Sequence, residues 1–329
     1  MDRRRFLRHL GAAGAVAASG AFVPLLGCGK GAGKPGGGSA AAPGAAPASR
    51  QARALAADLV VCEGNDPYLQ TVKAIEAIGG IDLFVKPGDR VVLSPNLAFA
   101  RTPEQGANTH PRVLRAVLDQ CVKAGATKIT VLDYVLDAKE VAFKMNGAEE
   151  AVAGTIARLI SPEDERQYQK LDVSKLKTHA AHNLEQMVAT EITKANVYIA
   201  IPVFKDHEAG VLSGALKKVM GVIWDRKGYH RADLHACIAE INTLIKPSLI
   251  IGDATRVMQT RGPKGPGEMA KPRKVLAAVD PVAADAYAVR WLRKDGTLKP
   301  SDVAHLVQAA ALGRGRLDLA QAKILEVTA

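Results

Sequence analysis

Short apolar runs alternate along this chain with longer segments in which apolar residues recur every three or four positions. The short runs are rich in Val, Ile and Leu at consecutive positions, which is typical of strands buried on both faces, and the longer segments have the spacing of amphipathic helices. Strands are predicted at 57–62, 90–93, 128–133, 197–201, 249–252, 275–279 and 323–327. Helices are predicted at 68–78, 111–125, 232–244, 281–292 and 302–312. This alternation predicts an α/β fold with a mostly parallel sheet, or sheets, covered by helices on both faces.

Two parts of the chain have a weaker pattern. Helical stretches are predicted to continue from 148 to 159, and residues 161–195 are charged and weakly periodic. His179 and His182 lie three residues apart in this region, so one helix face could present both imidazoles. Because no Glu-containing metalloprotease pattern accompanies them, exposure of both histidines to solvent is the favoured interpretation.

The segment 197–231 carries the densest candidate chemistry. Its strand is followed by Pro202, where the chain is predicted to leave the sheet, and in open α/β sheets ligands bind at this carboxyl edge. Lys205 and His207 come directly after, a cation and a group that titrates near neutral pH. Each of the two could equally be a surface residue, but their place behind a strand favours a site.

A helix is predicted to begin near Gly214, because apolar residues recur at helical spacing from 211 to 220. Free N–H groups in its first turn, together with Lys217, would bind a carboxylate or a phosphate. A glycine-rich turn with two lysines is also typical of a solvated helix start, so both interpretations stay open. Arg231 ends the same segment and is a further candidate for binding an anion.

Polar residues also follow other predicted strands. Asn96 and Asp133 stand at two strand ends, and Asp253 follows the strand 249–252. Thr109 is placed to cap the next helix through its hydroxyl group, which leaves His110 to be explained. His110 is predicted either to face the cleft as a general acid/base or ligand, or to have no such role.

Three longer motifs resemble those of a known family. Residues 202–207 match Pro-x-x-Lys-x-His, and residues 246–254 match Lys-Pro-x-Leu-x-x-x-Asp-Ala. Residues 214–221 match Gly-Ala-x-Lys-Asn-x-x-Gly, with Lys218 in the place of Asn. By their order and spacing, these motifs resemble the domain of unknown function 362 family over nearly all of the chain after residue 56. The resemblance implies an architecture and a set of site positions, and it names no activity.

Shorter stretches extend this resemblance. The triplet Thr109-His110-Pro111 is similar to one in the family, and so is the Asp-Pro pair at 280–281. The strand that ends Ser94-Pro95-Asn96 has Ser where the family usually has Lys, so a cation is missing there. The loop 262–267 is similar to a Gly-Pro-x-x-Gly segment of the family, and it could be either a lid over a ligand or a plain connector.

The beginning of the chain predicts export. Residues 1–28 resemble a twin-arginine signal with Arg3 and Arg4 as the pair, followed by an uncharged stretch that is too weakly apolar for a confident membrane span. The four residues that end in Cys28 resemble a lipobox, so the protein is expected to be periplasmic or anchored by lipid at Cys28. Residues 29–53 are mostly Gly, Ala, Pro and Ser and are predicted to be a disordered tether before an α/β domain at 54–329.

Charge and cysteine content exclude several classes of function. The formal net charge is +11, but residues 1–50 hold seven Lys/Arg and one Asp, so the remainder carries 37 basic and 32 acidic residues, or +5. With aromatic residues at 4% and no clustering of basic and aromatic residues, we expect no nucleic-acid partner. Cys62, Cys121 and Cys237 have no Cys-x-x-Cys spacing, so no iron–sulfur cluster is expected. In an exported chain these three cysteines could form one disulfide and leave one free thiol, but they are predicted to be small core residues.

Together these patterns predict an enzyme that acts on a small anionic substrate, a carboxylate or a phosphate, by acid/base or metal-assisted chemistry. Lys205, His207 and His110 are the predicted catalytic residues, and Asn96, Gly214, Lys217 and Arg231 are predicted to bind the substrate. Asp253 would orient a histidine or bind a divalent metal. The alternative is a non-catalytic, lipid-tethered protein that binds a ligand or cofactor. The sequence identifies neither a cofactor nor a redox partner.

Overall fold

The computed structural model describes residues 54–293 and 295–329, and every structural statement below concerns these residues. The twin-arginine signal, the lipobox and the tether predicted from the sequence lie outside the described residues. Within the described ranges, no helix combines the length and the apolar character that crossing a membrane would require.

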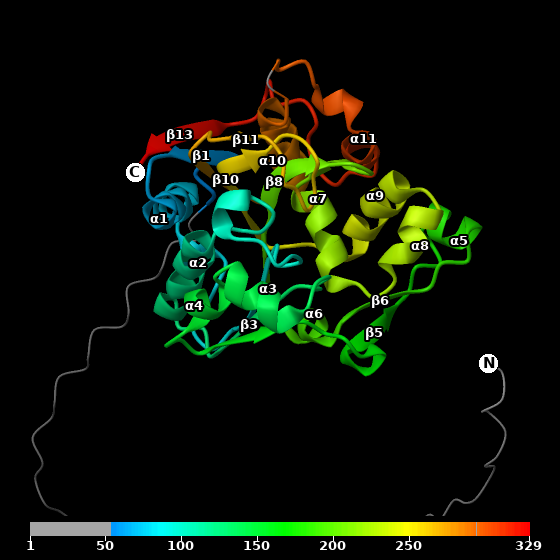
Figure 1. Cartoon of the computed structure of the whole chain (residues 1–329), viewed down its shortest axis with the longest axis horizontal. Coiled ribbons are helices and arrows are strands. Elements are labelled where there is room, and N and C mark those ends of the chain that lie inside the picture. Colours follow the sequence, from blue (N-terminus) through cyan, green and yellow to red (C-terminus); the bar gives the residue numbers. More distant parts are fainter. Residues whose placement is uncertain (1–53, 294) are drawn as a thin grey trace, which may run out of the picture. The chain divides into compact units, whose positions relative to one another are not determined.

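The described part contains strands and helices in regular alternation over most of its length (Figure 1). The strands are β1 (Leu59–Glu63), β2 (Arg90–Pro95), β3 (Lys128–Leu132), β4 (Ala157–Ile160), β5 (Tyr168–Leu171), β6 (Gln186–Ala189), β7 (Val197–Ile201), β8 (Val203–His207), β9 (Val211–Ser213), β10 (Leu249–Met258), β11 (Met269–Ala270), β12 (Lys274–Ala278) and β13 (Ile324–Thr328). The α-helices are α1 (Pro67–Ile78), α2 (Pro111–Lys123), α3 (Lys139–Met145), α4 (Ala148–Val152), α5 (Lys177–Ala181), α6 (Thr190–Lys194), α7 (Ala215–Lys218), α8 (Arg226–Arg231), α9 (Leu234–Leu244), α10 (Pro281–Ala288) and α11 (Ala304–Ala311).

A mixed sheet of eleven strands forms the centre of this domain, and its main path runs β13-β1-β12-β10-β7-β2-β3-β4. From β10 to β4 every neighbouring pair on this path is parallel. β12 runs antiparallel to both β1 and β10, and β13 lies parallel to β1 at the edge. A separate two-stranded sheet pairs β5 with β6. The predicted α/β fold with a mostly parallel sheet is confirmed.

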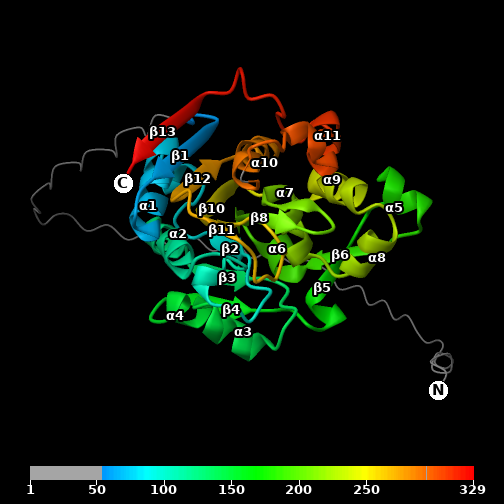
Figure 2. The same ribbon diagram turned by 45° about the horizontal axis from the view of Figure 1, so that its top comes forward.

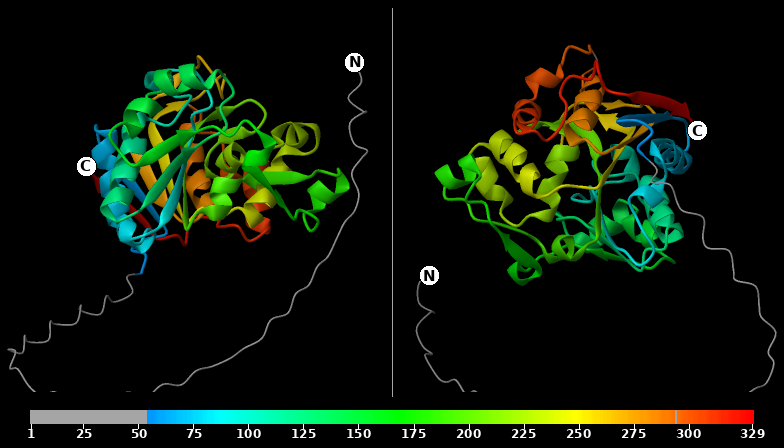
Figure 3. Two further views of the ribbon diagram at one scale, coloured as in Figure 1. Left: turned by 90° about the horizontal axis from the view of Figure 1, so that it is seen from below. Right: turned by 180° about the vertical axis from the view of Figure 1, so that it is seen from behind.

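Helices cover both faces of the large sheet (Figures 2 and 3). Successive side chains of a strand point to opposite faces, so β7 contributes to two cores. Tyr198 and Ala200 belong to the core that includes residues of α7, α9 and α10, whereas Ile199 and Ile201 belong to the core that includes residues of α1 and α2. All five residues of β7 are buried, and each large apolar side chain buried in this way contributes about 1.5–3 kcal/mol. The three described cysteines are buried and unpaired, as predicted.

Two helix starts show how the sequence sets the element boundaries. The Asp280 carboxylate accepts a hydrogen bond from the backbone N–H of Ala283 at 2.8 Å and caps α10. The prediction that Thr109 caps α2 is wrong, because His110 is the capping residue and its Nδ1 accepts the N–H of Arg112 at 3.2 Å. The Thr109 hydroxyl instead donates to the carbonyl of Ile201 at 2.7 Å, which ties the start of α2 to the end of β7.

Two predictions for the middle of the chain are also wrong. The helix expected to reach residue 159 ends in α4, and β4 follows as an edge strand paired with β3. Its residues are only partly buried, so the pattern of a buried strand is missing. His179 is fully buried, with its Nδ1 2.8 Å from Glu240 and its Nε2 2.8 Å from the Tyr229 hydroxyl, whereas His182 is exposed as predicted.

The chain does not leave the sheet at Pro202. It continues as β8, which pairs with β10 in parallel and with β9 in an antiparallel hairpin. Lys205 and His207 therefore lie on a buried strand and not on a loop. β10 is longer than predicted for the same reason, since it extends past Asp253 to meet β8. This hairpin carries the cationic residues of the central segment into the interior of the domain.

Candidate functional site

A cavity of about 350 Å³, here called the central cavity, lies beyond the carboxyl ends of β2 and β3, between β8 and the helices α7 and α8. Open α/β sheets bind ligands at this edge. Polar and charged residues line it from five segments: Asn96, Asp133, Tyr134, Lys205, His207, Ser213, Lys217, Lys218, Arg226, Lys227 and His230. Four of the predicted site residues are therefore brought together here, namely Asn96, Lys205, His207 and Lys217.

Positive charge dominates this lining. It includes five Lys or Arg side chains and a single carboxylate, that of Asp133. Asp133 is already neutralised, because its Oδ1 lies 2.8 Å from Nζ of Lys218 and both side chains are almost fully buried. The other four cations have no ion pair among the described residues. Of these, Lys205 is buried and Lys217 and Arg226 are partly buried, whereas Lys227 is exposed. Because charges buried without a partner are costly, the central cavity is suited to an anion that would supply the negative charge missing beside Lys205, Lys217 and Arg226.

Lys205 is the most deeply buried of these unpaired cations, with 2% of its surface exposed. Its Nζ donates a hydrogen bond to the carbonyl of Ala107 and lies 5.2 Å from the centre of the Phe99 ring. Burial, followed by the charge of nearby Lys217, lowers the pKa of Lys205 to about 7. Near neutral pH this amine can therefore both give and accept a proton.

Lys217 belongs to α7, and its side chain faces the same cavity. Burial, followed by the charges of Arg226 and Lys218, lowers the pKa of Lys217 to about 8. Arg226 stacks on Tyr134, with its guanidinium carbon 3.3 Å from the ring centre. An anion held between these side chains would raise the pKa values of Lys205 and Lys217 back toward their ordinary range.

His207 is a neutral hydrogen-bond donor in this arrangement. Its Nδ1 accepts the backbone N–H of Gly210 at 3.1 Å, so the ring proton resides on Nε2. Burial, followed by the charges of Lys217 and Lys205, lowers the pKa of His207 to about 2, which keeps the ring uncharged at neutral pH. Asn96 adds a second neutral donor, because its side-chain carbonyl accepts the N–H of Val203 at 2.9 Å and its amide nitrogen remains available.

Gly214 does not face a ligand. The first two N–H groups of α7, on Ala215 and Leu216, donate to the carboxylate of Asp285 at 2.5 and 3.0 Å. A Cβ atom on Gly214 would lie 2.2 Å from Oδ1 of Asp285, so the glycine permits this close approach. Asp285 is fully buried, and burial raises its pKa to about 7. The anion predicted for this helix start is thus a side chain of the protein itself.

Asp253 and His110 form a separate cluster outside the lining of the central cavity. Oδ2 of Asp253 accepts the N–H of His110 at 2.8 Å and pairs with Arg256, and Oδ1 accepts both the N–H and the hydroxyl of Thr255. Burial would raise the pKa of Asp253, but the charges of Arg256 and His110 and these hydrogen bonds outweigh it and lower the pKa. With both carboxylate oxygens engaged, Asp253 is an internal ion-pair partner.

No group of three His, Cys, Asp or Glu side chains placed to hold a metal ion occurs within residues 54–293 and 295–329. Asp253 belongs to no such group, and its oxygens are held by Arg256, by the N–H groups of His110 and Thr255, and by the Thr255 hydroxyl. The described residues therefore do not fit the divalent metal considered for Asp253.

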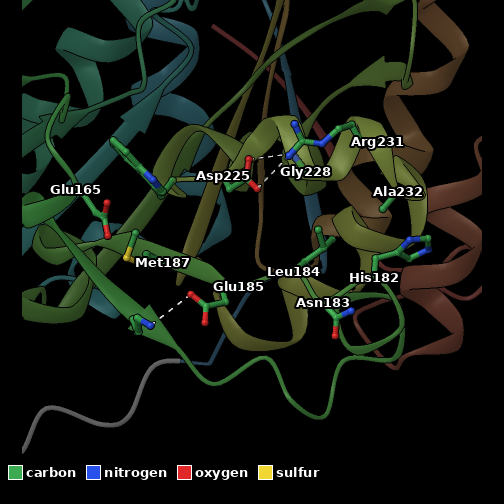
Figure 4. A pocket seen from close by; sticks show the side chains of 12 residues that line it. Glu165, His182, Asn183, Leu184, Glu185, Met187, Asp225, Gly228, Arg231 and Ala232 are labelled. Carbon is green, nitrogen blue, oxygen red and sulfur yellow. Dashed lines mark hydrogen bonds and ion pairs between the residues drawn. The ribbon is translucent and has the colours of Figure 1, made fainter. Parts of the chain in front are cut away.

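Arg231 lies in a second cavity, of about 560 Å³, between α8 and the segment that contains β5 and β6 (Figure 4). Its side chain is largely exposed and lies 3.9 Å from Asp225. Within α8, Arg226 and His230 are four residues apart and line the central cavity, whereas Arg231 is directed elsewhere. The spacing groups Arg226 with His230 and separates both from Arg231, but the sequence does not show which face of this short helix meets the cavity.

The fold and the central cavity define an α/β protein with a cation-lined site at the carboxyl edge of its sheet. The chain belongs to the family described as a domain of unknown function, DUF362, whose model matches residues 91–290. The resemblance noted in the sequence motifs is confirmed by this match.

Comparison with curated proteins finds a thylakoid-associated protein of Synechocystis sp., sll1697, which is 45% identical over 51 residues. The match covers 16% of this chain and 16% of that relative. Among solved structures, a protein from Thermotoga maritima matches with a TM-score of 0.40 and 16% identity, over 64% of this chain and 55% of that one. The lactate racemase apoprotein of Thermoanaerobacterium thermosaccharolyticum matches with a TM-score of 0.41 and 11% identity, over 60% of this chain and 50% of that one.

Proposed function

We propose that this protein is an enzyme that acts on a small anionic substrate by proton transfer, with Lys205 as the general acid/base. The observation that carries the proposal is the central cavity itself, in which four cations without an ion pair surround a space of small-molecule size. The charge of this lining selects for an anion. The buried amine of Lys205, with its pKa lowered to about 7, matches the range in which general bases are most effective.

Different side chains of the central cavity serve substrate binding and proton transfer. Lys217 and Arg226 hold the carboxylate or phosphate group of the substrate, and Nε2–H of His207 donates a hydrogen bond to it. The neutral amine of Lys205 takes a proton from a carbon next to the anionic group and becomes an ammonium. Negative charge that develops on the substrate is then stabilised by the same cations. His207 acts here as a donor and not as a base, because its Nδ1 is occupied by Gly210.

Solvent exchange of substrate hydrogens tests this proposal directly. The full-length protein is incubated in D₂O with a panel of small carboxylates, and loss of the proton next to the carboxylate is followed by NMR. Exchange is expected with the wild type, and Lys205→Met should reduce it at least 100-fold, since general acid/base catalysis contributes about 10²–10⁴-fold. Binding of the same carboxylates, measured by calorimetry, should be weakened by Lys217→Met.

Arg231→Met is the matched control, because this cation lies in the second cavity. The proposal is wrong if Lys205→Met and Lys217→Met both leave carboxylate binding and hydrogen exchange at wild-type levels. Binding without exchange in the wild type would favour the alternative, a non-catalytic protein that binds an anionic ligand.

A further inference from the structure

The lining of the central cavity has an apolar end and a cationic end. At the apolar end, Ala98 and Phe99 follow β2, and Leu136 follows β3. The N–H of Leu136 donates to the carbonyl of Ala98 at 2.9 Å, so these two loops lie side by side. Pro263 of the β10–β11 loop completes this end, and the neighbouring Lys264 places its Nζ 5.9 Å from the Phe99 ring.

The cationic end is formed by α7 and α8. Lys217, Arg226 and His230 lie near enough to one another for their charges to interact. Tyr134 fixes this end to the strand β3, because its ring carries the Arg226 guanidinium and its N–H donates to the carbonyl of Gly221 at 3.0 Å. The segment after β3 contributes Tyr134 to the cationic end and Leu136 to the apolar end, and otherwise the two ends are formed by different elements and differ in chemistry.

Lys205 lies where the two ends meet. Its Nζ is 5.2 Å from the centre of the Phe99 ring on one side, and the charge of Lys217 acts on it from the other. A ligand that places its anionic group at Lys217 and Arg226 and extends toward Phe99 must pass Lys205. The atoms that reach Lys205 are then those that join the anionic group to the rest of the ligand.

We propose that the substrate is an amphiphilic organic anion, in which an aliphatic or aromatic body is joined to a single anionic head group. This inference rests on the proposed function and names its substrate class. The head group binds at Lys217 and Arg226, and the body packs on Phe99, Leu136 and Pro263. The reacting carbon is the one next to the head group. A volume of about 350 Å³ limits the body to a short chain or a single ring.

Calorimetric titration of the full-length protein with four probes tests this inference. The probes are 3-phenylpropanoate, propanoate, inorganic phosphate and 3-phenylpropanamide. We expect 3-phenylpropanoate to bind at least tenfold more tightly than propanoate or phosphate, which lack the apolar body, and than the amide, which lacks the charge. Lys217→Met should weaken the two carboxylates by a similar factor, whereas Leu136→Ser should weaken 3-phenylpropanoate alone.

Leu136 suits this experiment because its side chain is 58% exposed, so the substitution leaves the folded core intact. Phe99→Ala gives a second, larger truncation of the apolar end. If propanoate or phosphate binds as tightly as 3-phenylpropanoate, the substrate class is wrong while an anion site remains. If none of the three anions binds to the wild type, the proposed function fails together with this inference.

Discussion

Lys205 holds a charge that the interior of the domain disfavours. Its ammonium is removed from water, has no carboxylate partner among the described residues, and lies close to another lysine. Such a group costs stability in the folded state whenever it is protonated. A destabilising group of this kind is retained most readily where it serves function. The loss of stability that it causes can be measured.

We predict that Lys205→Met stabilises the protein at pH 6, by about 1–4 kcal/mol. Because the pKa of Lys205 is lowered to about 7 in the folded protein, the group is protonated in both the folded and the unfolded state below that value, and the full penalty applies. Above pH 7 the folded state releases the proton first, so the penalty declines as the pH rises toward the ordinary pKa of lysine.

Urea unfolding at pH 6 and pH 9 measures this effect. The advantage of Lys205→Met over the wild type should be smaller at pH 9. Loss of the hydrogen bond to Ala107 lowers the stability of the variant at both pH values, so the trend with pH is the decisive result. Lys227→Met, a change of an exposed lysine at the same cavity, should alter the free energy of unfolding by less than about 0.5 kcal/mol. A difference that is independent of pH would contradict the prediction.

A second prediction concerns the contact between Gly214 and Asp285. Gly214→Ala places a methyl group where Asp285 now sits and should lower the free energy of unfolding by about 1–3 kcal/mol. A double-mutant cycle with Asp285→Ala measures the clash. The double variant should be more stable than the sum of the two single changes implies. Additive losses would show that the cost of Gly214→Ala does not arise from a clash with Asp285.

The residues of the candidate site were only partly predictable. Lys205, His207 and Lys217 follow a recognisable buried strand, and the edge of a parallel sheet brings such residues together. The sequence could not reveal that Asp285, 71 residues after Gly214, occupies the first turn of α7. Nor could it show the direction of each residue in a helix as short as α8, which contains six residues.

At the scale of elements, the long apolar strands were predictable and the partly exposed ones were not. β2, β3, β7 and β12 are buried almost throughout, and their runs of Val, Ile, Leu and Ala identify them. β4 has no fully buried residue, so its pattern is that of a surface segment. β8 was missed because Lys-Asp-His is unusual for a strand. Its polar groups are accommodated by the cavity and by hydrogen bonds that only the folded structure supplies.

The antiparallel direction of β12 also could not be predicted from the sequence pattern. A buried strand has the same composition whether its neighbours run parallel or antiparallel to it. The antiparallel course of β12 follows from the connection after β10, where the chain turns back through β11 without an intervening helix. Loop length and return direction, and not strand composition, decide this part of the topology.

The loop between β10 and β11 is an element whose movement can be tested. Its Lys264 pairs with Asp137 at 2.8 Å, and Asp137 in turn accepts the N–H of Ala100 at 2.9 Å. The ion pair thus links the loop to both strand ends that border the apolar end of the central cavity. We predict that Lys264→Ala accelerates hydrogen–deuterium exchange of amides in 259–268 and raises both the association and dissociation rates of a bound anion.

The size of this change is limited. A partly exposed ion pair contributes at most about 1 kcal/mol, so the rates should rise by no more than about fivefold. Lys271→Ala is the matched control, because this exposed lysine has no ion pair among the described residues. Unchanged exchange in 259–268 would mean that the loop is a fixed connector. Stopped-flow measurement of anion binding gives the two rates separately.

At the scale of the whole molecule, we propose that the chain is exported through the twin-arginine route and anchored by lipid at Cys28. Replacing Arg3 and Arg4 by Lys is expected to retain the protein in the cytoplasm of a bacterial host that has this route. Cys28→Ser should leave export intact but release the protein from the membrane fraction. Cell fractionation and immunoblotting measure both outcomes, with Arg8→Lys as the control. Export of the double Lys variant at the wild-type level would contradict the twin-arginine route.

β1 and β10 run parallel to each other on either side of β12, and this direction determines the edge of the sheet at which the described chain begins. β1 starts at Leu59, and its direction matches that of the strands that lead to the central cavity, so the chain enters at the amino edge of the sheet. The hydrogen bond from Ala56 to the last residue of α1 agrees with this, since α1 returns to the same edge. The central cavity and the first described residues therefore lie at opposite edges of the sheet.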